Sequence, residues 1–113
     1  MSAITTHVLD TSSGRPAGGV AVTLEVRAEA GWQILGRGRT DADGRLKSLL
    51  PADFDLKAGA YRLTFGTSDY FAARNVESFY PEVTISFVVT DAAAHYHVPL
   101  LVSPFGYSTY RGS

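Results

Sequence analysis

The sequence predicts an all-β domain, in which about eight strands form a two-sheet sandwich and one short segment is helical. Three observations lead to this fold class. Apolar residues alternate with polar ones in several segments, turn-forming residues separate these segments at strand-length intervals, and a single segment carries helix formers instead. A barrel would show the same alternation, and sequence alone does not exclude it.

The alternation is clearest in residues 20–26, where valine and leucine occupy every second position. Side chains two positions apart lie on the same face of a strand, so this pattern indicates a half-buried strand. Residues 83–89 repeat it. In chain order, the expected strands cover residues 6–10, 20–26, 32–40, 45–50, 61–65, 83–89, 95–103 and 106–112.

The segment 67–75 breaks the alternation and predicts the one short helix. Thr67 or Ser68 is the expected N-cap, because a hydroxyl can accept a hydrogen bond from a free N–H group of the first turn. Helix formers follow, and Asn75 is the expected end.

Composition limits the possible functions. The 113 residues suit one domain, which we expect to span 1–113. Ten basic and eleven acidic residues leave a formal charge of -1, which gives no electrostatic signature of nucleic-acid or membrane binding. The absence of cysteine excludes a disulfide framework and a thiolate nucleophile. The first residues do not resemble a signal peptide, and we expect a cytoplasmic protein.

The three histidines are the first candidates for chemistry. His95 and His97 are two positions apart in an expected strand and therefore share a face. Such a pair could hold a metal or could consist of exposed imidazoles. We expect no metal, because two histidines without a third nearby ligand form an incomplete zinc site. His7 lies within the first expected strand. Histidine is the side chain best suited to move protons near neutral pH.

Other polar residues give weaker signals. Residues 41–44 read as a turn, because the carboxylate that would complete a calcium loop is replaced by Ala52. Arg45 follows this turn. In the last strand, Ser108 and Tyr110 share one face by alternation. These residues alone indicate a β-sandwich with scattered histidine, arginine and hydroxyl groups, and they name no substrate.

Three separated blocks nevertheless match a known family. They are "THVLDTSSGRPA" at 6–17, "GRTDADGR" at 38–45 and "HVPLLVSPFGYSTYRGS" at 97–113, and residues 70–89 are also similar. With these blocks the chain resembles the 5-hydroxyisourate hydrolases, the transthyretin-related enzyme family. The closing Tyr-Arg-Gly-Ser is the most specific element of this resemblance.

The resemblance implies two four-stranded sheets in the transthyretin arrangement, with the helix after the fifth strand. It also implies a homotetramer, a dimer of dimers with active sites at subunit interfaces in a central channel. The expected reaction opens the ring of 5-hydroxyisourate and yields 2-oxo-4-hydroxy-4-carboxy-5-ureidoimidazoline, a step of urate degradation. The family needs no metal or organic cofactor.

The family's site residues can be placed on this sequence one by one, and His95 is not among them. In our hypothesis, the two matched histidines activate a water molecule, the matched arginine binds the electron-rich substrate, and the closing residues complete the site. The resemblance assigns catalysis to His7, Arg45, His97 and Ser113, and substrate binding to His7, Arg45, Ser108, Tyr110 and Arg111.

Two other functions remain open. A transthyretin-type carrier would bind a small aromatic ligand in the same channel, but the hormone-carrying transthyretins lack the two matched histidines, the arginine and the Tyr-Arg-Gly-Ser ending. A purely structural sandwich would leave this polar set unexplained.

Overall fold

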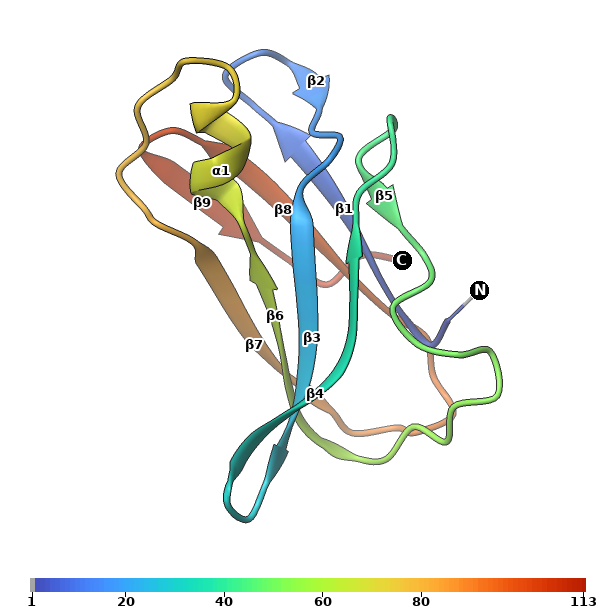
Figure 1. The fold of residues 1–113 in the computed structure, drawn as a ribbon. Helices are drawn as coiled ribbons and strands as arrows, with labels where there is room; N and C mark the ends of the chain where they lie inside the picture. Colours follow the sequence, from blue (N-terminus) through green and yellow to red (C-terminus); the bar gives the residue numbers. More distant parts are fainter. Residues whose placement is uncertain (1) are drawn as a thin grey trace.

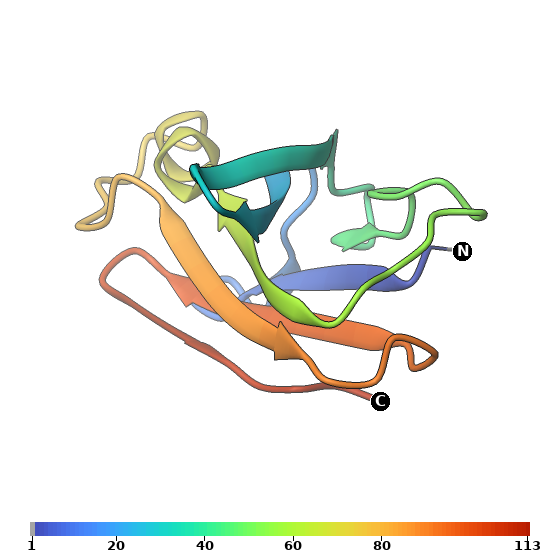
Figure 2. The same cartoon turned by 90° about the horizontal axis from the view of Figure 1, so that it is seen from below.

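The computed structural model describes residues 2–113 and consists of two β-sheets and one helix (Figure 1). The sheets pack against each other as two layers, which are separated in the view of Figure 2. The elements are β1 Ile4–Asp10, β2 Arg15–Pro16, β3 Ala21–Ala28, β4 Gly31–Arg39, β5 Arg45–Leu46, β6 Gly59–Phe65, α1 Thr67–Ala72, β7 Val83–Val89, β8 Tyr96–Ser103 and β9 Gly106–Thr109.

The first sheet brings the two ends of the chain together. Its strand order is β2-β1-β8-β9, and β1 runs parallel to β8 from Ile4 opposite Tyr96 to Asp10 opposite Val102. The short strands β2 and β5 both pair with β1 on the edge that β8 leaves free. The second sheet has the order β4-β3-β6-β7. Residues of the first and last strands can therefore share one site.

The core between the sheets confirms the predicted alternation. Val22 and Leu24 of β3 are buried, as are Val83, Ile85 and Val89 of β7. In the first sheet the buried face carries Ile4 and Val8 of β1 together with Val98, Leu100 and Val102 of β8. The odd-numbered residues of β1 and β8 consequently lie on the outer face of this sheet.

Four details of the strands differ from the expectation, the first being that the predicted strand 106–112 ends at Thr109. The predicted strand 45–50 contains strand only at Arg45–Leu46, because the chain then turns inward and buries Leu49 and Leu50 in the core. The additional strand β2 was not predicted. With β2 and β5 on the edge of β1, the first sheet has five strands, where the resemblance implied four.

The helix is shorter than predicted and begins differently. It covers Thr67–Ala72 instead of 67–75, and Gly66 is its N-cap, without a side-chain hydrogen bond. The expected cap at Thr67 or Ser68 is therefore wrong. The Gly66 N–H donates to the Ala21 carbonyl at 2.8 Å, which ties the start of the helix to β3 one residue earlier. Asn75 lies beyond the helix with a φ of 58°, a left-handed conformation that asparagine tolerates.

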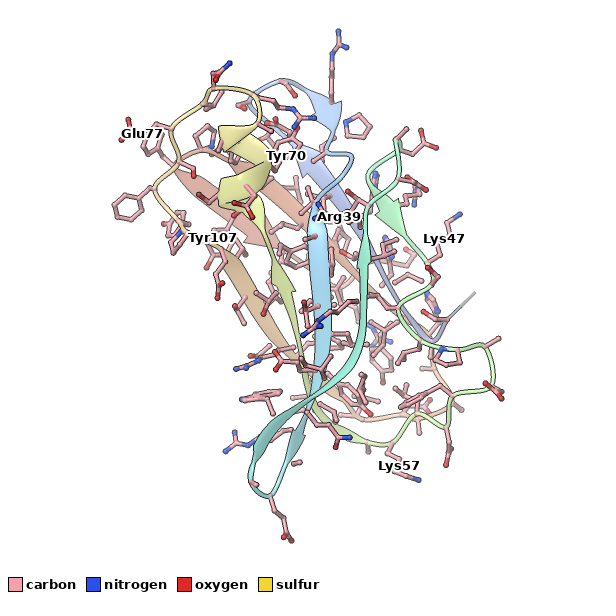
Figure 3. All side chains as sticks on the ribbon, in the orientation of Figure 1. Arg39, Lys47, Lys57, Tyr70, Glu77 and Tyr107 are labelled. Carbon is pink, nitrogen blue, oxygen red and sulfur yellow. The ribbon has the colours of Figure 1, made fainter. Side chains whose placement is uncertain are left out.

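A buried carboxylate connects the helix to β1. Asp10 accepts hydrogen bonds from the Ser12 hydroxyl at 2.6 Å and from the Tyr70 hydroxyl at 2.9 Å. Burial alone would raise the pKa of Asp10, but these hydrogen bonds and those from the N–H groups of Ser12 and Ser13 lower it below its ordinary value. Figure 3 shows Tyr70 on the helix above the strands.

We expect Tyr70→Phe to lower the free energy of unfolding by about 1.5–3 kcal/mol, because Asp10 loses a hydrogen bond to its charged form while the ring keeps its packing. Urea unfolding would measure this loss. Tyr107→Phe, which changes a tyrosine on the exposed edge strand β9, is the control. Equal stability of Tyr70→Phe and the control would contradict the role of this hydrogen bond.

Within residues 2–113, no helix is both long and apolar enough to cross a membrane.

Candidate active site

The pairing of β1 with β8 places two of the predicted histidines on the outer face of the first sheet. Thr5 lies opposite His97, and His7 lies opposite Pro99. Since all four positions are odd-numbered, their side chains point away from the core. His97 and Pro99 share this outer face of β8, and His7 lies on the same face of the neighbouring strand.

The turn before β5 positions Arg45. The Asp41 carboxylate accepts a hydrogen bond from the Arg45 N–H at 3.0 Å and holds the turn closed. Gly44 has a φ of +75°, and a Cβ atom there would lie 2.3 Å from the Val8 carbonyl oxygen. Glycine therefore lets the turn pack directly on β1. As a result Arg45 pairs with His7 and lies on the same outer face.

The closing residues are fixed to His97. The Gly112 N–H donates to the His97 carbonyl at 2.8 Å, in an isolated bridge beyond β9. A Cβ atom on Gly112 would lie 2.6 Å from Cδ2 of the His97 ring. Gly112 therefore lets the backbone lie against the imidazole, and Ser113 follows beside it.

We expect Gly112→Ala to displace the His97 ring and to lower turnover at least about 10-fold, because a small misplacement of a catalytic group reduces the rate strongly. Gly106→Ala is the matched control, since a Cβ there meets its nearest atom at 3.7 Å, an ordinary contact. Circular dichroism would establish that both variants fold. Wild-type turnover in Gly112→Ala would show that the close contact does not matter.

Three predicted catalytic residues line one cavity of about 220 Å³. Arg45 comes from β5, His97 from β8 and Ser113 from the closing segment. All the residues that line the cavity are of polar or basic type, and no acidic side chain is among them. The lining residues are Thr5, Thr6, Arg45, Lys47, His95, His97 and Ser113.

His97 is suited to accept a proton. Burial lowers its pKa below the ordinary 6.5, and the charge of Arg45 and the neighbouring His7 and His95 lower it further. The ring is therefore neutral at pH 7. Its Nδ1 lies 2.8 Å from the Thr5 hydroxyl oxygen. Nε2 is the nitrogen left for a ligand in the cavity.

His7 lies beside the cavity in a different hydrogen-bonding state. Its Nε2 is 3.0 Å from the backbone carbonyl oxygen of Asp43. A carbonyl oxygen only accepts hydrogen bonds, so Nε2 of His7 carries a hydrogen and donates it. His7 adjoins Arg45 across the β1–β5 pair but does not line the cavity.

The predicted substrate-binding residues Ser108, Tyr110 and Arg111 do not line this cavity. Ser108 of β9 pairs with Leu101 of β8 and lies on the outer face, but Leu101 is four residues along β8 from His97. Tyr110 and Arg111 line a second cavity of about 320 Å³ between β7 and β9, which contains no histidine. The Arg111 guanidinium lies 4.4 Å from the centre of the Tyr96 ring. Their roles in substrate binding stay predictions.

The sequence analysis did not select four residues that line the cavity, namely Thr5, Thr6, Lys47 and His95. Thr5 contacts both His95 and His97 through its hydroxyl, although His95 is not among the matched family positions. Alternation places Thr5 on the face of His7, but its contact partners are about 90 residues away. Lys47 follows β5 at the edge of the molecule opposite Tyr107 (Figure 3). Nothing in the sequence around Lys47 indicates that it lies near the histidines.

In the described part of the chain, no group of three or more His, Cys, Asp or Glu side chains could hold a metal ion. The acidic residues nearest in sequence to Arg45 serve the turn instead, where Asp41 is engaged by backbone N–H groups.

Comparison with known proteins gives one consistent result. A model described as the HIUase/Transthyretin family matches residues 4–112. A protein of Caulobacter vibrioides named 5-hydroxyisourate hydrolase is 50% identical over 117 residues, which cover 100% of both chains.

Two solved structures share the fold but carry different names. The 5-hydroxyisourate hydrolase of Klebsiella pneumoniae has a TM-score of 0.83 and 40% identity, covering 97% of this chain and 92% of that one. Transthyretin from Sparus aurata has a TM-score of 0.91 and 30% identity, covering 99% and 97%. The backbone alone therefore does not distinguish the two kinds of protein, and the side chains of the site must do so.

Proposed function

Because the chain belongs to the HIUase/Transthyretin family, we propose that it is a 5-hydroxyisourate hydrolase whose active site is the cavity between β1, β5, β8 and the closing segment. The single observation that carries this proposal is the arrangement of a neutral imidazole and a guanidinium around one cavity. His97 supplies the base, and Arg45 supplies the positive charge that an anionic intermediate requires.

The reaction is the addition of water to a cyclic acyl–nitrogen bond. Nε2 of His97 removes a proton from water as the water oxygen bonds to the substrate carbonyl carbon. The oxygen of that carbonyl becomes negative, and the Arg45 guanidinium stabilises it. The carbon–nitrogen bond then breaks, and the leaving nitrogen receives the proton. The product is 2-oxo-4-hydroxy-4-carboxy-5-ureidoimidazoline, and no cofactor takes part.

The other predicted residues have supporting roles in this proposal. His7 is the second imidazole of the proton shuttle, beside Arg45 on the same face. The Ser113 hydroxyl orients the attacking water. Ser108 of β9, together with Tyr110 and Arg111 that follow it, binds the ring from farther along the channel.

The residues favour hydrolysis over the carrier function. A carrier of an aromatic ligand needs an apolar binding surface with a few polar groups that fix orientation. The cavity around His97 has instead two cationic side chains, two histidines and three hydroxyl groups. This set suits an electron-rich substrate and proton transfer.

We propose that the enzyme is a homotetramer, a dimer of dimers. Support comes from the edges of the two sheets, where β7 and β9 are terminal strands and apolar side chains in or beside them are exposed. Val88 of β7 is 63% exposed, and Phe105 and Tyr110, which flank β9, are 67% and 60% exposed. Unpaired edges with apolar side chains favour association. Light scattering should give four times the 12.1 kDa of one chain. A cytoplasmic location stays a prediction.

A turnover assay tests the function. Freshly generated 5-hydroxyisourate, made from urate with urate oxidase, decays spontaneously, and its ultraviolet absorbance reports the remaining substrate. We expect the protein to accelerate this decay equally with and without a chelator. A folded protein that leaves the spontaneous rate unchanged would overturn the proposal and direct attention to ligand binding. Acceleration that a chelator abolishes would overturn the metal-free mechanism.

A further inference from the structure

A single hydroxyl group connects the proposed base to a second histidine. Thr5 Oγ1 lies 2.8 Å from Nδ1 of His97 and 3.0 Å from Nε2 of His95. Thr5 is opposite His97 in the β1–β8 pair, and His95 directly precedes β8. Thr5 is only 3% exposed, whereas His95 is exposed. The buried hydroxyl thus lies between two imidazoles of the cavity, of which His95 is the more exposed.

The hydrogen of this hydroxyl can go to either ring. Within residues 2–113 Thr5 Oγ1 has no hydrogen-bond partner besides these two nitrogens, and a buried hydroxyl group needs an acceptor. In the first arrangement, His97 Nδ1–H donates to Thr5, and Thr5 donates to His95. In the second, His95 Nε2–H donates to Thr5, and Thr5 donates to His97 Nδ1. Each arrangement fixes one tautomer of His97.

The two tautomers have opposite chemical uses. The first arrangement leaves a lone pair on Nε2 of His97, which can remove a proton from water. The second arrangement puts a hydrogen on Nε2, so this nitrogen can only donate a hydrogen bond into the cavity and cannot remove a proton from water. The cavity contains the cationic groups of Arg45 and Lys47. A lone pair directed toward positive charge is electrostatically favoured over an N–H group, which supports the first arrangement.

We propose that Thr5 and His95 are positioning residues that hold His97 in the tautomer with a free Nε2, through the chain His97 Nδ1–H to Thr5 O–H to His95 Nε2. The proposal rests on hydrolysis at this cavity. When Nε2 takes the proton from water, the Nδ1–H bond to Thr5 is kept, so the imidazolium is stabilised without movement of the ring.

This chain of hydrogen bonds makes catalysis depend on His95, although the proton is taken up by Nε2 of His97 and not by His95. Removal of the His95 ring leaves His97 Nδ1 as the one acceptor for the Thr5 hydroxyl, which selects the unproductive tautomer. Protonation of His95 on Nε2 has the same consequence. Around the two rings lie His7 of β1, Arg45 of β5 and Lys47 beyond it, while the Arg111 guanidinium donates to the backbone carbonyl of His95 at 3.4 Å. The positive charge of Arg45 opposes protonation of His97.

Substitutions at Thr5 separate the hydroxyl from the shape of the side chain. We expect Thr5→Val, which removes the hydroxyl and keeps the branched shape, to lower kcat at least about 10-fold with little change in KM, while Thr5→Ser stays within about 3-fold of wild type. His95→Leu should lower kcat to a similar extent. Combining Thr5→Val with His95→Leu should cause little further loss, because both changes break the same chain.

The tautomer itself can be observed without turnover. Nitrogen-15 spectra of the histidine side chains distinguish a ring with Nδ1–H from a ring with Nε2–H. We expect His97 to be Nδ1–H in the wild type and in Thr5→Ser, to lose this preference in Thr5→Val, and to become Nε2–H in His95→Leu. An Nε2–H ring in the wild type would overturn the inference, as would wild-type kcat in folded Thr5→Val. Absence of turnover in the wild type would reject the hydrolase proposal, and the spectra would still decide the tautomer.

Discussion

Replacing His97 with glutamine lowers kcat/KM for 5-hydroxyisourate at least about 100-fold, because glutamine cannot remove the proton from water and a general base contributes about 100- to 10,000-fold. Glutamine is polar and of similar length, so the outer face and the backbone bridge to Gly112 are kept. The measurement is the decay of the substrate absorbance, corrected for the spontaneous rate.

The pH dependence of the wild type provides a second view of the same group. His97 must be neutral to act as a base, so kcat/KM falls as the pH decreases through its pKa. Burial and the neighbouring charges place that pKa below the ordinary 6.5, so activity should persist into mildly acidic solution. The residual rate of His97→Gln should lack this acidic limb. A folded His97→Gln variant with near-wild-type kcat/KM would remove His97 from the mechanism.

Replacing Arg45 with alanine has an expected effect of similar size. Loss of one group that stabilises a developing oxyanion costs about 100- to 1000-fold in kcat, and Arg45 is the guanidinium of the cavity. Arg45→Lys keeps the charge but not the planar pair of donors, and we expect it to recover only part of the loss. Steady-state kinetics of both variants would measure these effects.

A control for Arg45 is Arg37→Ala, which removes an exposed arginine of β4 in the other sheet. Its kinetics should match the wild type. A lower rate in Arg37→Ala would reveal a general effect of losing one positive charge on the binding of an electron-rich substrate. If Arg45→Ala raised KM alone and left kcat intact, Arg45 would contribute uniform binding and would not stabilise the transition state.

Local pattern was sufficient to predict much of the fold. Alternation placed Val22 and Leu24 on one buried face, and both lie in the core, because side chains of a strand alternate whatever its neighbours are. The β5 segment was overpredicted, since Leu49 and Leu50 are buried by a loop instead of a strand. Burial produces the same apolar signal in either conformation.

The parts of the site that depend on long-range pairing could not be predicted in this way. The contact between Thr5 and His95 arises from the parallel register of β1 and β8, which joins residues 90 positions apart. The close approach of Gly112 to His97 depends on a bridge beyond the last strand. Neither has a local signature. The family resemblance supplied Arg45 and Ser113 as candidates, and the fold places both at the cavity of His97.

The location of the substrate is the central claim, and binding of urate tests it most directly. Urate is the stable purine from which 5-hydroxyisourate is made, so it should occupy the site without being consumed. Backbone and side-chain chemical shifts of nitrogen-15-labelled protein would be followed during a urate titration. We expect the largest changes at Thr5, Arg45, His97 and Ser113. Changes confined to Ile85, Val88 and Thr109, which line the cavity between β7 and β9, would contradict the proposed site.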